Sequence, residues 1–133
     1  DVCSSDLVDS WASVASGGLS LSENYLYTTQ AFKDYYDHLT DDGTLVILRW
    51  DLDIPRVIAN SVAALGATEA AKRVAILMEK RGDPRSAVDP SRMLFMLRKR
   101  PFTDAEIAMM KTDWTLARPV ILPGEAPAPY DQL

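Results

Sequence analysis

The sequence predicts an α/β domain that forms the second half of a doubly wound sheet and ends in an antiparallel pair of strands. Three observations support this fold class. Stretches with apolar residues at helical spacing alternate with short, continuous apolar runs, as in sheets whose parallel strands are covered by helices. Two further apolar runs are joined by a loop that contains two prolines. With 133 residues, 47% of them hydrophobic, the chain has room for one compact domain.

The first predicted helix covers residues 23–39. Ser22 can cap its first free amides, Glu23 is favourable in its first turn, and Gly43 follows its end. One face of this helix carries four large side chains at helical spacing, namely Phe32, Tyr35, Tyr36 and Leu39. The β-branched apolar run at 44–48 then predicts a strand that is buried on both faces.

The second predicted helix begins at Asp53, whose carboxylate can cap its first turn. Leu52 and Val57 have the spacing of a hydrophobic staple, and Gly66 supplies a left-handed stop. Its apolar face consists of Ile54, Val57, Ile58, Val62 and Leu65.

Two more strands are predicted at 74–78 and 93–97. The loop at 82–90 is too long for a two-residue hairpin and too short for a crossover helix, so the two strands are expected to pair antiparallel. Thr103 and Glu106 have the spacing of a capping box, which predicts a helix from there to about residue 114. The basic run at 98–100 is interpreted as a solvated strand end, with phosphate binding as the alternative.

Both ends of the chain are expected to lie outside the domain. Residues 1–7 have neither helix nor strand periodicity, and read as codons they look like a translated sequencing-adapter tail; an ordinary disordered tail is the alternative. Residues 119–133 contain four of the eight prolines and predict an extended connector. Residues 8–118 remain for the domain.

Composition excludes several classes of function. The net charge of −5 argues against a general nucleic-acid binder, because such proteins gather Lys and Arg against phosphates. The single cysteine excludes a disulfide framework and a Cys-rich zinc site, and the only histidine, His38, has no neighbouring ligand pair, so no metal site is expected. The longest apolar runs are far shorter than the roughly 18 residues of a membrane span.

Several short segments, in this order, resemble one family. They are Val-Asp-Ser at 8–10, Tyr-Leu-Tyr-Thr-Thr-Gln-Ala-Phe at 25–32, Asp-Gly-Thr-Leu-Val at 42–46, and the paired strands that end in Lys-Arg-Pro at 99–101. The chain is similar to the spermidine synthase-like (polyamine aminopropyltransferase-like) branch of the class I S-adenosylmethionine-dependent methyltransferase fold. The resemblance covers roughly residues 8–114 and only the C-terminal half of that family's Rossmann-like catalytic domain, whose last strands are reversed.

The resemblance implies a cofactor and a set of site residues. The cofactor is S-adenosylmethionine for methyl transfer, or its decarboxylated form for aminopropyl transfer. Asp9 matches the later acid of the family's Asp-Ser-x-Asp-Pro loop and is the candidate catalytic residue, since a carboxylate can hold an ammonium group and help to deprotonate it. The candidate substrate-binding residues are Ser10, Tyr27, Arg49 and Asp51. The cofactor-binding residues are not identified, because no Gly-x-Gly-x-x-Gly turn precedes a helix.

Each candidate also has a structural interpretation. Asp9 could be an ordinary loop acid, Tyr27 a packing residue, and Arg49 with Asp51 a local ion pair beyond a strand end. The sequence departs from the family at 49–51, where Arg-Trp-Asp replaces a Gln-Gly-acidic segment. An Arg there suits an anionic group better than an ammonium group. The substrate is therefore open at this stage.

Two functions follow from the resemblance. The first is a transferase that alkylates an amine or another small acceptor, of which this chain is an inactive part on its own. The second is a catalytically silent copy of the fold that serves binding or assembly. The expected partner is a small-molecule amine or similar acceptor, and a homodimer is left open. The expected location is the cytoplasm, or the cytoplasmic face of a membrane if the full-length protein has spans upstream.

Overall fold

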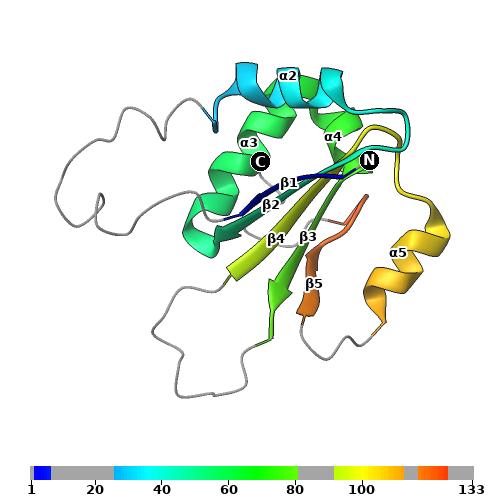
Figure 1. Cartoon of the computed structure of the whole chain (residues 1–133). Coiled ribbons are helices and arrows are strands. Elements are labelled where there is room, and N and C mark those ends of the chain that lie inside the picture. The colour runs from blue at the N-terminus through cyan, green and yellow to red at the C-terminus, as the bar shows by residue number, and fades with distance from the viewer. Residues whose placement is uncertain (1, 7–25, 81–91, 113–116, 126–133) are drawn as a thin grey trace, which may run out of the picture.

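The computed structural model describes residues 2–6, 26–80, 92–112 and 117–125. These residues form an α/β structure, as the sequence predicts (Figure 1). In chain order the elements are β1 (Val2–Asp6), α2 (Thr29–His38), β2 (Thr44–Trp50), the 3-10 turn η1 (Asp51–Asp53), α3 (Ile54–Leu65), α4 (Ala67–Arg73), β3 (Val74–Glu79), β4 (Arg92–Arg98), α5 (Asp104–Lys111) and β5 (Ala117–Ile121).

The strands form one sheet in the order β1-β2-β4-β3-β5. β1 and β2 are parallel, with Asp6 opposite Leu48. The predicted antiparallel pairing of β3 with β4 is confirmed, with Leu77 opposite Leu94. The strand β4 also pairs antiparallel with β2 and therefore lies between β2 and β3. Consequently β1, β2 and β3 run in one direction, while β4 and β5 run in the other.

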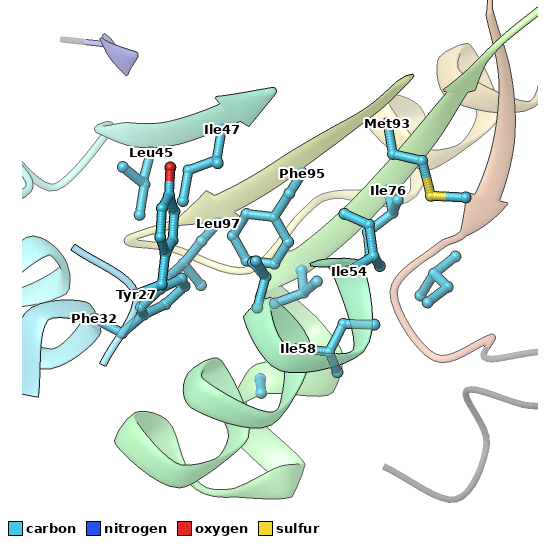
Figure 2. Close-up of a cluster of buried hydrophobic side chains, with 14 residues drawn as sticks. Tyr27, Phe32, Leu45, Ile47, Ile54, Ile58, Ile76, Met93, Phe95 and Leu97 are labelled. Atoms are coloured by element: carbon cyan, nitrogen blue, oxygen red, sulfur yellow. The ribbon is translucent and has the colours of Figure 1, made fainter. Parts of the chain in front are cut away.

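Helices cover the two faces of the sheet unequally. α2, α3 and α4 lie on one face, where fourteen buried side chains form the main core (Figures 1 and 2). Phe32 of α2 and Phe95 of β4 are both fully buried, and their rings meet edge to face at 6.0 Å. On the other face a smaller cluster joins Met110 of α5 to Ala75 and Leu122.

This unequal cover corrects the prediction for β2. Its residues alternate between buried and half-buried positions, so the strand is not buried on both faces. Leu45, Ile47 and Arg49 point to the main core, and the side chains between them are only half-buried. In β3, by contrast, Val74 to Leu77 are all buried, because the smaller cluster covers Ala75 on the far face.

The predicted helices occur with shifted ends. Thr28 caps α2, its Oγ1 accepting a hydrogen bond from the Ala31 amide at 3.1 Å, whereas the predicted cap, Ser22, lies outside the described residues. Asp53 precedes α3, but its side chain caps no amide. Leu52 is 79% exposed, so no hydrophobic staple forms.

The structure confirms two of the predicted helix signals. Gly66 has a φ of 83° and ends α3, and α4 then starts directly as a further helix that the sequence pattern did not predict. Thr103 and Glu106 form the predicted capping box at the start of α5. Residues 113 and 114 of that predicted helix lie outside the described part.

Both chain ends contribute strands where the sequence predicts none. Residues 2–6 form β1 rather than a tail, because backbone pairing with β2 requires no apolar periodicity. Residues 117–121 form β5, so the predicted connector begins too early. Pro119 is tolerated at the edge of the sheet, and Ile121 and Leu122 are buried.

Candidate functional site

The candidate site lies at the carboxyl end of β2, where α/β sheets commonly bind ligands. It is formed by Tyr27, Arg49, Asp51 and Asp53, which we call the β2-end cluster. Tyr27 comes from the segment ahead of α2, Arg49 is the second-last residue of β2, and the two acids come from η1. The short η1 turn therefore brings acids next to a strand-end arginine.

Arg49 is the buried centre of this cluster, with only 7% of its surface exposed. Its Nη2 donates to Oδ2 of Asp53 at 3.0 Å, and its guanidinium carbon lies 4.5 Å from the centroid of the Tyr27 ring. Burial lowers the pKa of Arg49, and the nearby Asp53 carboxylate opposes that effect. An arginine keeps its charge even so, and the Asp53 carboxylate compensates part of that charge.

The solvent-exposed part of the β2-end cluster is a carboxylate. The side chain of Asp53 is 38% exposed, against 9% for that of Arg49, and Asp51 is half-buried. One guanidinium and two carboxylates give the four named residues one net negative charge, and Arg56 of α3 is a further cation close enough to act on Arg49. The Asp53 carboxylate thus faces solvent while the arginine is shielded, so the exposed charge among these four residues is negative and favours a cation over an anion. The earlier inference that Arg49 suits an anionic substrate is not supported by this burial.

Tyr27 is held in place by the helix that follows the cluster. Its carbonyl oxygen accepts a hydrogen bond from Nδ2 of Asn60 at 2.7 Å, and the Asn60 Oδ1 accepts one from the Thr29 hydroxyl at 3.4 Å. The Tyr27 ring is 5% exposed and belongs to the main core (Figure 2). Tyr27 is therefore a packing residue that also supports Arg49.

The structure brings together three of the five sequence-predicted site residues. Tyr27 and Arg49 are in contact at the end of β2, Asp51 follows in η1, and Arg49 forms an ion pair with Asp53. Asp9 and Ser10 lie outside the described residues. The last residue of β1, Asp6, lies opposite Leu48 of β2.

Sequence reasoning missed the site roles of two residues. Asp53 was assigned to helix capping, since an acid just before an apolar period is the usual cap signal. Asn60 was not singled out at all. Asparagine is a poor interior helix residue because it competes for backbone hydrogen bonds, and that was the signal that could have drawn attention to it.

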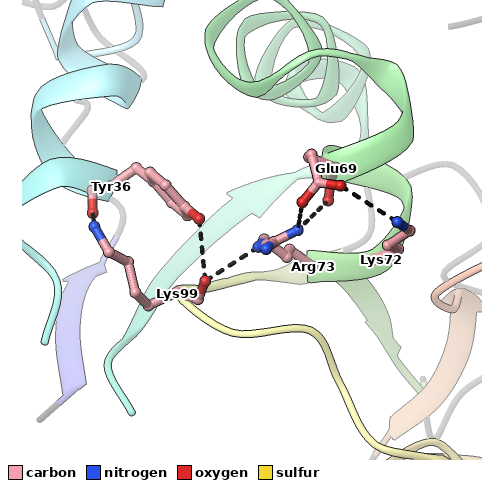
Figure 3. Close-up of polar contacts among 5 residues, drawn as sticks. All are labelled: Tyr36, Glu69, Lys72, Arg73 and Lys99. Atoms are coloured by element: carbon pink, nitrogen blue, oxygen red, sulfur yellow. Dashed lines mark hydrogen bonds and ion pairs between the residues drawn. The ribbon is translucent and has the colours of Figure 1, made fainter. Parts of the chain in front are cut away.

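The basic run at 98–100 is engaged in tertiary contacts at the opposite end of β2. Arg98 is buried and pairs with Glu106, and Arg100 pairs with Asp42 at 2.9 Å. Lys99 donates from Nζ to the Tyr36 carbonyl at 2.7 Å, while its own carbonyl accepts from the Tyr36 hydroxyl and from Arg73 (Figure 3). Lys99 thus connects α2 and α4 to the end of β4. The solvated interpretation is wrong for Arg98, which is buried, whereas Arg100 is exposed.

Within residues 2–6, 26–80, 92–112 and 117–125, no three His, Cys, Asp or Glu side chains are grouped so that they could hold a metal ion. In that same part of the chain, every helix is too short or too polar to cross a bilayer.

Comparison of this chain with protein-family models, with curated proteins and with solved structures finds no match. The β2-end cluster must therefore be interpreted from its own geometry.

Proposed function

We propose that this chain forms the acceptor-binding side of an S-adenosyl-dependent transferase domain of the spermidine synthase-like kind, which alkylates an amine. The observation that carries the proposal is the strand order. The strands β1, β2 and β3 run in the same direction, and the reversed strand β4 lies between β2 and β3. A Rossmann-like sheet whose last strands are reversed is what the family resemblance implies, and this order agrees with it.

The charge of the β2-end cluster supports an amine as the acceptor. Asp53 presents a carboxylate to solvent, Asp51 lies two residues away, and the buried Arg49 holds the Asp53 side chain. A carboxylate binds an ammonium group by a charge-assisted hydrogen bond, and it can accept the proton that an attacking nitrogen must lose. In the proposed site, Asp51 and Asp53 bind the ammonium group, and Asp9 accepts the proton.

The S-adenosyl group would supply the electrophilic carbon. The printed sequence has no Gly-x-Gly-x-x-Gly turn, and we find no cradle for this group among the described residues. The proposal therefore assigns to this chain the acceptor side alone and routes no step through the cofactor.

A catalytically silent copy of the fold is the second candidate. It is favoured by the way Arg49, at a position where the family has a different segment, is buried and paired with Asp53. An ion pair of this kind can stabilise the fold without binding any ligand. The two candidates differ in whether the end of β2 recognises an amine.

An amide-resolved titration separates them. The ¹⁵N-labelled chain is titrated with the diamine putrescine, with succinate and 1,4-butanediol as anionic and neutral probes of equal carbon number. Saturable shifts confined to the backbone amides of residues 49–53, seen with putrescine alone, are expected for the transferase. No saturable shift up to ~10 mM contradicts the amine site and favours the silent copy, because weaker binding contributes under about 3 kcal/mol.

Two carboxylate variants control for nonspecific charge. Asp53→Asn is expected to abolish the putrescine shifts. Asp42→Asn is the matched control, since Asp42 also pairs with one arginine, Arg100, but at the opposite end of β2. If both variants reduce the shifts equally, the amine is attracted by net charge and not by the β2-end cluster.

A further inference from the structure

The contacts around Arg49 form a circuit that begins on α3 and ends at Asp53, the residue just before that helix. From Asn60 the circuit passes to the Tyr27 carbonyl, from the Tyr27 ring to the Arg49 guanidinium, and from there to Asp53. Asp53 immediately precedes α3, and Asn60 lies seven residues further on, about 10 Å along the helix axis. One rigid helix therefore anchors both ends of the circuit.

The Asn60 side chain acts in this circuit as a hydrogen-bond donor. The Tyr27 carbonyl precedes α2, whose first intrahelical bond runs from the Phe32 amide to the Thr28 carbonyl. Nδ2 of Asn60 donates to the Tyr27 carbonyl from outside α2, at 2.7 Å. An aspartate of the same shape has no N–H to donate.

The positions of the Tyr27 ring, Arg49 and Asp53 depend on the position of the Tyr27 carbonyl. The Tyr27 ring is fixed relative to its backbone by the core around Phe32 and Leu45, so a shift of the backbone moves the ring (Figure 2). The ring lies against the guanidinium of Arg49, and Arg49 holds the carboxylate of Asp53. The direction in which Asp53 points thus depends on a hydrogen bond two helical turns away.

We infer that Asn60 is a positioning residue, which holds Tyr27 against Arg49 and thereby orients Asp53 toward the acceptor. The inference rests on the proposed function for its effect on a ligand, whereas its effect on Arg49 needs no ligand. It adds to the site a residue that touches neither acceptor nor cofactor.

The test compares Asn60→Asp and Asn60→Ala with Thr29→Ala. Thr29→Ala removes only the weaker hydrogen bond of Asn60, at 3.4 Å, and leaves the donor to Tyr27 intact. The first readout is the Arg49 side-chain Nε–Hε resonance, assigned by its loss in Arg49→Met, because the Tyr27 ring current displaces it from its random-coil position. The second is the dissociation constant of putrescine.

Both Asn60 variants are expected to move the Arg49 resonance toward its random-coil position and to weaken putrescine binding about fivefold to tenfold, while Thr29→Ala does neither. A lower melting temperature with an unchanged Arg49 resonance overturns the inference, since a merely structural Asn60 gives that result. If wild-type protein binds no putrescine, the proposed function fails, and the Arg49 resonance still decides whether Asn60 positions Tyr27.

Discussion

Removing the Asp53 carboxylate should destabilise the protein, because the buried Arg49 charge loses an ion-pair partner at 3.0 Å. Breaking a fully buried ion pair on one side costs about 3–5 kcal/mol, whereas an exposed pair is worth about 0–1 kcal/mol. Here Arg49 is 9% exposed and Asp53 is 38% exposed by side chain, so water already reaches one partner. We therefore expect Asp53→Asn to cost about 1–2 kcal/mol, between those two limits.

The cost is measured by thermal unfolding at pH 7, followed by circular dichroism. For a domain of this size, 1 kcal/mol corresponds to about 3–4 °C, so the melting temperature should fall by about 3–8 °C. No helix-capping bond is lost, because the Asp53 side chain caps no amide. The matched control is Asp42→Asn, which breaks a pair whose partners are both half-exposed or more and should change the melting temperature by under 2 °C or so.

A double-mutant cycle isolates the cause. Arg49→Met keeps an apolar stem against Tyr27 and removes the buried charge. Adding Asp53→Asn to Arg49→Met should then cost less than about 0.5 kcal/mol, because no buried charge remains to be compensated. The reasoning is refuted if Asp53→Asn costs as much in the Arg49→Met background as in the wild type, or no more than Asp42→Asn.

Three further predictions concern the scaffold. Gly43→Ala should lower the melting temperature, since an added Cβ would lie 2.9 Å from the Thr40 carbonyl oxygen; a melt equal to that of wild type contradicts this. Phe95→Ala should cost about 3–5 kcal/mol by urea unfolding, because the ring is fully buried. Hydrogen bonds from Thr103 lower the pKa of Glu106 from 4.5 to about 2, so its stabilisation is complete above pH 4.5 and is lost as pH falls toward 2. Glu106→Gln should flatten that part of the stability profile in urea unfolding from pH 6 to pH 2, and an unchanged slope would refute the assignment.

The local elements of the main sheet could be read from periodicity. Continuous apolar runs locate β2, β3 and β4, and the capping-box spacing locates the start of α5. These signals succeed because they depend on neighbours within one turn or one strand. The antiparallel pairing of β3 and β4 followed from the length and prolines of the loop that joins them.

The candidate site was only partly visible in the same way. Arg49 and Asp51 could be identified because ligands bind beyond the carboxyl ends of strands. The role of Asp53 could not, because an acid before a helix has the same local signature whether it caps an amide or pairs with an arginine. Asn60 contacts Tyr27 across 33 residues of chain, which no spacing rule relates.

Spacing along the chain thus specified which segments become helices and strands, and where the polar residues at the end of β2 occur. It did not specify that β4 lies between β2 and β3, that residues 2–6 and 117–121 add strands at the two edges, or that Arg49 is buried. Those outcomes depend on which backbone edges and apolar faces meet once the elements pack together. Their free energy comes from contacts between distant residues, and a local pattern carries no record of such contacts.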